Sequence, residues 1–333
     1  MKRKVDFDLK NGKSKFALDT DDNDIKLPAL ITFVGARGTG KTYSCVALVR
    51  HYETKEYVTR TFLMSPTTES NDIFENLKTL DKEKDVYEDP SMFSMSLADI
   101  KDKIKTDWDE YERSVEYRRV YKKWQHNEYS LTIQEEMLME RMNYEEPKTI
   151  PRPSHVLIID DAQGTNVYTN SSTNAMTHLA IKHRHVPVTI CFLVQSWTGL
   201  PRTLRLNSTQ FVLFKTADKK QLFQMYESFG NLTDWETFEK MFVYCTDSKN
   251  GFLFIDTDPK EEKYRFRKGF DELLIVNKKD DESSEEEKKD HKHAFPSTKR
   301  KTSGTPLFIG KEESVDASSE IRSTQKHGGY KHR

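Results

Sequence analysis

The stretch FVGARGTGKTYS, residues 33–44, is the feature that most constrains the fold of this chain. It follows an apolar segment that predicts a strand, and it runs into a segment that predicts a helix. Gly35, Gly38 and Gly40 lack a Cβ atom, so backbone N–H groups can converge there on an anion. The strand, the GxxxxGKT spacing and the helix together predict a phosphate-binding P-loop.

The lysine and threonine that end this loop predict a site for a nucleotide and its magnesium ion. We expect Lys41 to contact the β and γ phosphates of ATP and Thr42 to offer its hydroxyl to Mg²⁺. Arg37 adds a cation that either contacts a phosphate or points into solvent. The predicted nucleotide-binding residues are Gly35, Ala36, Arg37, Gly38, Thr39, Gly40, Lys41 and Thr42. ATP and Mg²⁺ are therefore the expected cofactors.

An acidic pair follows a second apolar segment, in HVLIIDDAQ, residues 155–163. Ligands of open α/β sheets bind at the carboxyl ends of the strands, which places Asp160 and Asp161 beside the P-loop. We expect Asp160 to bind Mg²⁺ together with Thr42. Asp161 is expected to polarise the water that attacks the γ-phosphate, which favours hydrolysis over transfer to an acceptor. The alternative for Asp161 is a cap on the next segment.

A polar residue also ends the next strand along the chain. Gln195 closes the apolar run VTICFLVQ, residues 188–195. We expect its side chain to sense the γ-phosphate or to orient water, and the alternative is a hydrogen bond to a neighbouring loop. Lys41, Asp161 and Gln195 are thus the candidate catalytic residues that these motifs supply.

Continuous apolar runs predict an α/β fold with a mainly parallel central sheet flanked by helices, because strands covered on both faces need no polar alternation. The expected strands are residues 28–35, 59–65, 154–160, 188–195 and 209–216. Two later segments, FVYCT and GFLFID, are interpreted as a hairpin that adds antiparallel strands at the sheet edge, with Asn250 and Gly251 in its turn.

Residues 81–150 predict a helical insertion between strands of the core. Apolar residues recur every three or four positions on one face of a long helix, and the segment LTIQEEMLMERM predicts a second helix. The apolar face comprises Leu97, Ile100, Ile104, Trp108, Tyr111 and Val115. The insertion is interpreted either as a cover over the sheet or as a lid or subunit contact.

The two ends of the chain differ from its middle in composition. Only 35% of the 333 residues are hydrophobic and 32% are charged. We therefore expect a mobile N-terminal arm at residues 1–26, a folded domain at 27–275 and a charged, disordered tail at 276–333. The net charge of -1 excludes a globally basic nucleic-acid coat. No apolar run reaches the roughly 20 residues of a membrane-spanning helix.

Three segments resemble the virion DNA-packaging ATPases of poxviruses and other large DNA viruses: FVGARGTGKT, HVLIIDDAQ and IKHRHVPVTICFLVQSWTGLPRTLRLNSTQFVLFKT. That family has relatives in virophages and belongs to the FtsK/HerA superfamily of P-loop ATPases. The resemblance covers about residues 28–275. It implies a RecA-like P-loop NTPase fold of the ASCE class and a Mg-dependent ATPase that translocates viral double-stranded DNA into preformed capsids.

The same resemblance implies partners, a location and residue roles. The partners are double-stranded DNA, further copies of the chain in a hexameric or pentameric ring, and a capsid or portal protein. The location is the viral assembly site in the host cell cytoplasm, or the virion. Lys41 and Thr42 become nucleotide ligands, Asp160 the metal residue, Asp161 the catalytic carboxylate and Gln195 the sensor. Most motors of the superfamily carry Glu at the position of Asp161.

The resemblance also implies an arginine that completes the site of a neighbouring subunit. Arg184 is the first candidate for this arginine finger, and Arg202 and Arg205 are the alternatives. Each is otherwise a contact to DNA phosphates or a solvent-exposed charge. Two functions of other classes stay open: a P-loop kinase of a small acceptor, with the insertion as its lid, and a nucleotide-regulated assembly scaffold.

Overall fold

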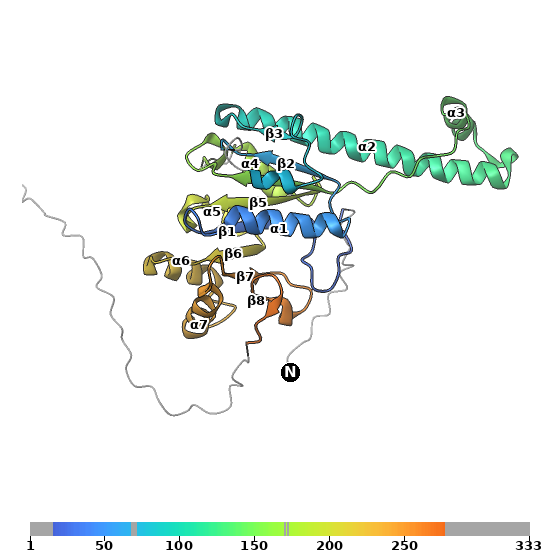
Figure 1. Ribbon diagram of the computed structural model, residues 1–333. Helices are drawn as coiled ribbons and strands as arrows, with labels where there is room; N and C mark the ends of the chain where they lie inside the picture. The colour runs from blue at the N-terminus through green and yellow to red at the C-terminus, as the bar shows by residue number, and fades with distance from the viewer. Residues whose placement is uncertain (1–15, 68–71, 170, 172, 277–333) are drawn as a thin grey trace, which may run out of the picture. The chain divides into compact units, whose positions relative to one another are not determined.

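The computed structural model of the chain describes residues 16–67, 72–169, 171 and 173–276 (Figure 1). The expected charged tail lies outside these residues except for residue 276, and residues 1–15 of the expected arm lie outside them as well. Within the described part of the chain, no helix has both the length and the apolar character that crossing a membrane requires.

The described residues form one nine-stranded sheet with the strand order β3-β2-β4-β5-β1-β6-β7-β8-β9. The strands from β3 to β6 in this order are parallel, and β7, β8 and β9 are antiparallel additions at one edge. They are β1 (Leu30–Val34), β2 (Arg60–Met64), β3 (Val86–Tyr87), β4 (His155–Asp160), β5 (Val188–Val194), β6 (Gln210–Phe214), β7 (Phe252–Asp256), β8 (Phe266–Lys268) and β9 (Glu272–Leu273). The five strands expected from continuous apolar runs are all present, which confirms the α/β fold with a mainly parallel sheet.

The strand order also identifies the class of P-loop fold. The P-loop follows β1 and the acidic pair follows β4, and β5 lies between these two strands and pairs with both of them. An added strand at this position distinguishes the ASCE class. All three strands are buried at every residue, as strands covered on both faces should be.

Helices cover both faces of the sheet. The helices are α1 (Lys41–Thr54), α2 (Phe93–His126), α3 (Ile133–Arg141), α4 (Ala175–Lys182), α5 (Arg202–Asn207), α6 (Lys219–Phe229) and α7 (Trp235–Thr246). Alternate residues of β1 point to opposite faces: Ile31 and Phe33 pack with α1, whereas Leu30 and Val34 belong to the core under α2 and α4 to α7. The sheet therefore separates two apolar cores.

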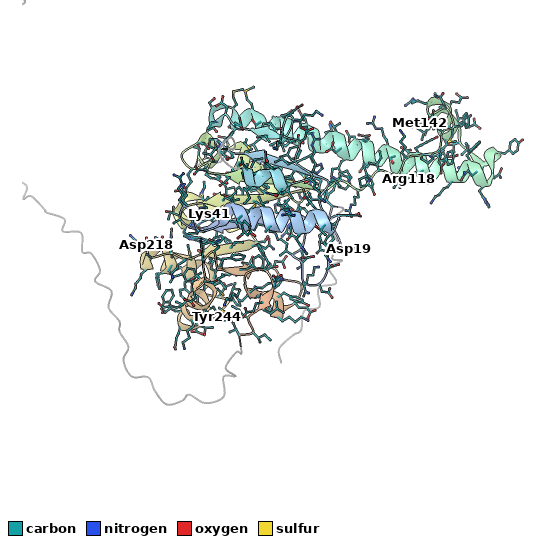
Figure 2. All side chains as sticks on the ribbon, viewed as in Figure 1. Asp19, Lys41, Arg118, Met142, Asp218 and Tyr244 are labelled. Carbon is teal, nitrogen blue, oxygen red and sulfur yellow. The ribbon has the colours of Figure 1, made fainter. Side chains whose placement is uncertain are left out.

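The insertion consists mainly of the 34-residue helix α2 and of α3. The first half of α2 places Leu97, Ile104 and Trp108 in the core of the sheet, as expected. Val115 is 41% exposed, because the second half of α2 lies beyond the sheet and packs instead on α3 around Val120 and Met139 (Figures 1 and 2). The insertion thus covers the sheet with one half and forms a small separate core with the other.

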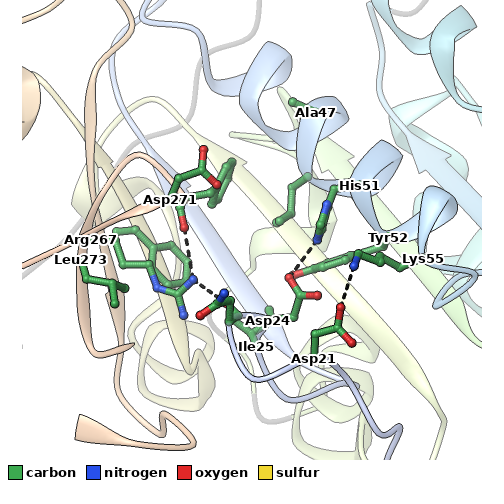
Figure 3. A pocket seen from close by; sticks show the side chains of 14 residues that line it. Asp21, Asp24, Ile25, Ala47, His51, Tyr52, Lys55, Arg267, Asp271 and Leu273 are labelled. Atoms are coloured by element: carbon green, nitrogen blue, oxygen red, sulfur yellow. Dashed lines mark hydrogen bonds and ion pairs between the residues drawn. The ribbon is translucent and has the colours of Figure 1, made fainter. Parts of the chain in front are cut away.

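Residues 16–26, which we expected in a mobile arm, are held against the domain. Lys55 directly follows α1, and its Nζ lies 2.6 Å from Asp21 Oδ2, while Nε2 of His51 on α1 lies 2.9 Å from Asp24 Oδ1 (Figure 3). Ile25 is buried, and Phe16 packs edge-on against Trp108 of α2. The folded part therefore begins earlier than residue 27, because apolar residues within the polar stretch anchor it.

The expected hairpin of FVYCT and GFLFID is wrong. Residues 242–246 end helix α7, where Phe242 and Cys245 are buried and Val243 and Tyr244 are exposed, so the segment follows a helical period. GFLFID does form β7, an antiparallel addition, but its neighbours are β6 and β8. Asn250 has the expected positive φ of 63°, in the connection between α7 and β7.

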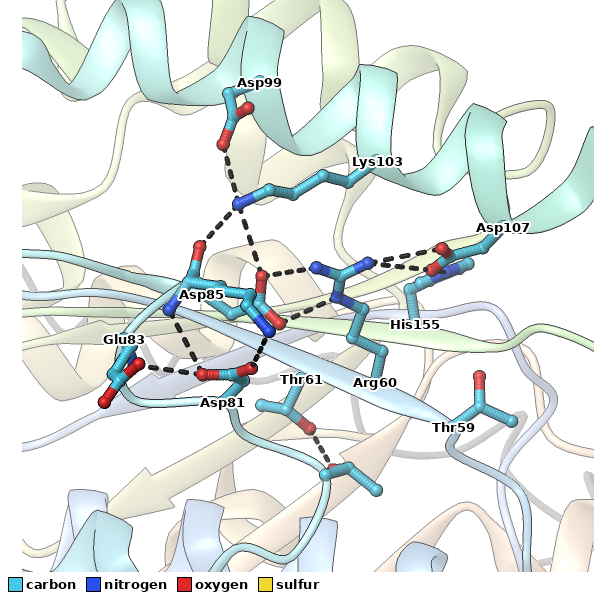
Figure 4. A network of polar contacts seen from close by, with 12 residues as sticks. Thr59, Arg60, Thr61, Asp81, Glu83, Asp85, Asp99, Lys103, Asp107 and His155 are labelled. Carbon is cyan, nitrogen blue, oxygen red and sulfur yellow. Dashed lines mark hydrogen bonds and ion pairs between the residues drawn. The ribbon is translucent and has the colours of Figure 1, made fainter.

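A network of charged side chains fastens α2 to the amino ends of β2 and β4 (Figure 4). Arg60 of β2 donates two hydrogen bonds of 2.7 Å to the buried Asp85 and two longer ones, of 3.2 and 3.3 Å, to Asp107 of α2. Asp107 Oδ2 also lies 3.0 Å from His155 Nε2 at the start of β4. Lys103 of α2 forms a further ion pair with Asp85, at 3.4 Å.

We expect the variant Asp85→Ala to lose about 3 kcal/mol of unfolding free energy, because Arg60 and Lys103 then lose their shared buried partner. Denaturant titration measures this loss. The matched control is Glu75→Ala, which removes the exposed partner of Lys82 and should change the free energy by less than about 0.5 kcal/mol. Equal effects of the two variants would contradict the structural role of the network.

Candidate functional site

The loop between β1 and α1 has the backbone geometry that phosphate binding requires. Gly38 and Gly40 have φ values of 80° and 97°, which side chains disfavour. A Cβ at Gly35 would lie 2.6 Å from Thr39 Oγ1 and 2.7 Å from Phe214 Cβ. The glycines of the motif are therefore needed for two reasons, namely a left-handed backbone and close contact with a neighbouring strand.

The loop is held by hydrogen bonds of its own side chains. Thr39 Oγ1 donates to the carbonyl of Ala36 over 2.8 Å, and Lys41 Nζ donates to the same carbonyl over 3.0 Å. Burial lowers the pKa of Lys41, although Asp160 and Asp161 act in the opposite direction. A cation that leaves water at such a cost gains much from an anionic ligand.

The structure brings the two predicted metal ligands into contact. Thr42 Oγ1 donates a 2.9 Å hydrogen bond to Asp160 Oδ2, although the residues are 118 positions apart. Asp160 is only 7% exposed, and this burial raises the pKa of its carboxyl. A hydroxyl beside a buried carboxylate fits Mg²⁺, which takes few protein ligands and completes its shell with water and phosphate oxygens.

Asp161 is directed away from the strand by an unusual backbone conformation. Its φ is 50°, in the left-handed region, which Asp tolerates better than most residues. Its Oδ1 accepts a 2.8 Å hydrogen bond from Nε2 of Gln195, at the end of β5. The two predicted catalytic side chains therefore form one unit. Because Asp161 lies in the loop after β4, the bond also fits the alternative in which Gln195 holds a neighbouring loop, and its role as a sensor stays a prediction.

These groups line a cavity of about 570 Å³ at the carboxyl edge of the sheet, beside Lys41. Its lining residues are Arg37, Gly38, Gly40, Lys41, Thr42, Tyr43, Thr67, Asp160, Asp161, Leu193, Gln195, Lys249 and Asn250. Gly35, Ala36 and Thr39 belong to the loop without lining the cavity. The volume, the basic loop and the Thr42–Asp160 pair fit a nucleotide phosphate chain with its magnesium ion.

Lys249 and Asn250 are cavity residues that the sequence motifs did not reveal. They precede β7, which is antiparallel to β6, so the start of β7 lies where β6 ends: Phe252 pairs with Phe214. The connection consequently reaches the P-loop, and a Cβ at Gly40 would lie 3.0 Å from Asn250 Cγ. Only the antiparallel pairing of β7 could have indicated this placement.

The three candidate arginine fingers lie away from this cavity. Arg184 precedes β5 and lines a small hollow together with Pro28, Thr209 and Asp258, at the opposite, amino edge of the sheet. Arg202 and Arg205 lie on α5 and line another hollow, between α5 and α6. Any contact of these arginines with a P-loop nucleotide would therefore involve a second copy of the chain.

No residue of the insertion, within the part of it that the structure describes, lines the P-loop cavity. The network of Arg60, Asp85 and Asp107 instead holds α2 at the amino edge of the sheet. The interpretation of the insertion as a lid over the nucleotide gains no support from this arrangement. A role as a subunit contact stays a prediction.

No protein-family model matches the chain, and no curated protein matches it either. Similar solved structures exist. The genome packaging NTPase B204 of Sulfolobus turreted icosahedral virus 2, in complex with ATP-gammaS, is 15% identical, with a TM-score of 0.41, and the match covers 74% of this chain and 98% of that one. B204 of Sulfolobus turreted icosahedral virus, a DNA-packaging ATPase, is 12% identical, with a TM-score of 0.44 and coverages of 73% and 97%.

A third solved structure is also similar. EssC from Geobacillus thermodenitrificans (ATPases 2 and 3) is 11% identical, with a TM-score of 0.44, over 76% of this chain and 41% of that one. At these identities and TM-scores, the assignment of the fold rests on the strand order and the P-loop geometry of the chain itself.

We expect Asp160→Asn to stabilise the metal-free protein. The raised pKa of Asp160 means that the protonated carboxyl favours folding at low pH and that this contribution is lost as the pH rises through the raised value. At pH 7 in EDTA the variant should gain on the order of 1 kcal/mol, and the gain should shrink on acidification. Thermal unfolding between pH 4 and 8 measures this. A variant that is no more stable than the parent at pH 7 would refute the cost of burying Asp160.

Lys249→Met should weaken ATP binding by about 1 kcal/mol, or roughly fivefold, because an exposed cation is lost from the rim of the cavity. Titration with a fluorescent ATP analogue measures the affinity, and the effect should decrease with added salt. Lys219→Met, on α6 and outside the lining, is the control and should leave the affinity unchanged. An equal loss in both variants would mean that Lys249 acts only through net charge.

Proposed function

We propose that the chain is a Mg-dependent ATPase that translocates double-stranded DNA, and that it belongs to the FtsK/HerA superfamily as a virion DNA-packaging motor. The observation that carries this proposal is the joined pair of Asp161 and Gln195, which ends neighbouring strands beside the P-loop cavity. A carboxylate held by a polar side chain at the γ-phosphate end of a P-loop suits activation of water.

Each residue of the site has a task in this proposal. Lys41 and the loop amides bind the phosphates, and Thr42 with Asp160 holds the metal. When bound, Mg²⁺ supplies charge neutralisation on the β and γ phosphates. Asp161 accepts a proton from the attacking water, while Gln195 fixes the carboxylate and responds to loss of the γ-phosphate. The hydrogen bond between them couples nucleotide state to β5.

The remaining parts of the proposal concern partners and place. A translocating motor needs further copies of the chain, so we propose a homo-oligomeric ring, a hexamer or a pentamer, with double-stranded DNA as its substrate. A capsid or portal protein is the proposed docking partner, and the viral assembly site in the host cytoplasm or the virion is the proposed location. Arg184, or one of Arg202 and Arg205, would complete a neighbour's site.

The alternatives have less support from the geometry. A small-acceptor kinase needs a lid over its phosphates, and the insertion is anchored at the other edge of the sheet. A nucleotide-regulated scaffold needs no water-activating carboxylate, whereas Asp161 is held in a left-handed conformation and in a hydrogen bond to Gln195. Neither alternative accounts for the Asp161–Gln195 pair.

Asp161→Asn tests the proposed chemistry. The amide oxygen of Asn can still accept from Gln195, so ATP affinity should persist, while kcat should fall about 100-fold or more through loss of the base. Steady-state ATP hydrolysis, with and without duplex DNA, measures this, and the parent should be stimulated by DNA. A monomeric parent indifferent to DNA, or a fully active variant, would overturn the proposal.

A mixture of inactive variants tests the arginine in trans. Arg184→Ala and Lys41→Ala should each lack activity, yet mixed rings would contain some interfaces with an intact P-loop and an intact arginine. We expect ATP hydrolysis to recover partially as the ratio of the two is varied. The absence of recovery at every ratio would remove Arg184 and pass the assignment to Arg202 or Arg205.

A further inference from the structure

The hollow between α5 and α6, here called the α5–α6 hollow, contains an unbalanced positive charge. Its volume is about 600 Å³, and Arg202 and Arg205 both line it. Among the residues that the structure describes, neither guanidinium has a carboxylate within ion-pair distance or a hydrogen-bond acceptor. Three residues apart on one helix, the two cations lie on the same face and repel each other.

Arg205 is held in place although the described part of the chain offers its guanidinium no hydrogen-bond acceptor. Its Cζ atom lies 5.2 Å from the centre of the Trp197 ring, and Trp197 is fixed in turn by Phe211 and Phe229 and is 1% exposed. The Nε atom of Arg205 is buried, and no group of the residues in the structure's described ranges accepts a hydrogen bond from it. Such an N–H group costs free energy unless a ligand accepts from it.

Other polar groups of the hollow also suit an anion. Gln224 on α6 presents a side-chain amide that has no partner among the described residues, and Ser228 and Thr198 add hydroxyls to the lining. Glu227 lines the same hollow and opposes anion binding, but it forms no ion pair with either arginine within the described part of the chain. The cations therefore outnumber the carboxylate without being neutralised by it.

Burial alone does not produce this imbalance elsewhere in the chain. The hollow in Figure 3 has a similar volume of about 610 Å³ and contains Arg267, which is more deeply buried than Arg205. The guanidinium of Arg267 donates to the carbonyls of Asn23 and Phe270, and Lys55 in the same lining pairs with Asp21. Its cations have acceptors within the chain, whereas those of the α5–α6 hollow have none among the residues that the structure describes.

We propose that the α5–α6 hollow is a second oxyanion site, separate from the P-loop, in which Arg202 and Arg205 bind a phosphate group. Planar guanidinium groups donate to two phosphate oxygens at once, and the Trp197 stack keeps one of them oriented before the ligand arrives. The phosphate belongs either to a phosphodiester of nucleic acid or to a nucleotide held by a second copy. Phosphate binding in the hollow requires no turnover, whereas a neighbour's nucleotide as the source of the phosphate rests on the proposed function as a ring motor.

Calorimetric titration with tripolyphosphate tests the site directly. The background variant Lys41→Ala weakens phosphate binding at the P-loop, so the remaining binding reports on the hollow. Adding Arg202→Gln and Arg205→Gln should weaken it about tenfold or more, and adding Glu227→Gln should strengthen it. The control pair Arg113→Gln and Arg118→Gln removes the same charge from α2 and should have no such effect. Equal binding with and without Arg202 and Arg205 would overturn the proposal.

Folding and the source of the phosphate need separate measurements. Arg202 is exposed, so Arg202→Gln alone should keep the parent's unfolding temperature and still weaken binding, while Arg205→Lys should retain charge but lose the two-pronged contact. For nucleic acid, the double variant should reduce the salt dependence of binding to a DNA duplex. If the phosphate belongs to a neighbour's nucleotide, ATP turnover per subunit of the parent should rise with protein concentration, and the double variant should reduce this rise. If neither changes, the hollow is not a functional phosphate site.

Discussion

Parallel strands end at the same edge of a sheet, and this constraint brings the site together. Val34, the last residue of β1, pairs with Val194 of β5, and Asp160, the last residue of β4, pairs with Leu193. The two strands therefore end beside neighbouring residues of β5, which lies between them. Burial of all three strands fixes this register, since a slip of one residue would exchange the two faces of the sheet. The contact between Thr42 and Asp160 is therefore a consequence of apolar packing far from the polar atoms themselves.

The same constraint separates the functions of the two edges. The insertion is attached where β2 and β4 begin, through Arg60 and His155, and so it leaves the carboxyl edge open to a ligand. A buried ionic network contributes little net stability compared with an apolar one, but it tolerates only one arrangement of its partners. Its role is consistent with setting the direction in which α2 leaves the sheet.

The sequence predicted the parts of the site that depend on local pattern, and it missed those that depend on pairing across the sheet. The P-loop and the acidic pair each lie within ten residues of a buried strand, so their positions follow from strand direction alone. FVYCT misled because its β-branched and aromatic residues favour strands, while the period of Phe238, Phe242 and Cys245 that buries α7 becomes visible only in a longer window. The place of Lys249 depends on the antiparallel pairing of β7, which no local pattern contains.

Charged groups without internal partners distinguish ligand sites from structural ones in this chain. Burial lowers the pKa of both Arg267 and Arg205, yet of the two only Arg267 donates to carbonyl oxygens of the described residues. Lys41 lies between these two cases, because among the described residues its Nζ atom donates only to the carbonyl of Ala36, within the phosphate loop itself. Keeping such cations partly desolvated lowers the stability of the ligand-free protein, and binding of a phosphate raises it again. Such a loss of stability is therefore expected where a ligand binds. Outside the P-loop, the α5–α6 hollow contains cations of this kind.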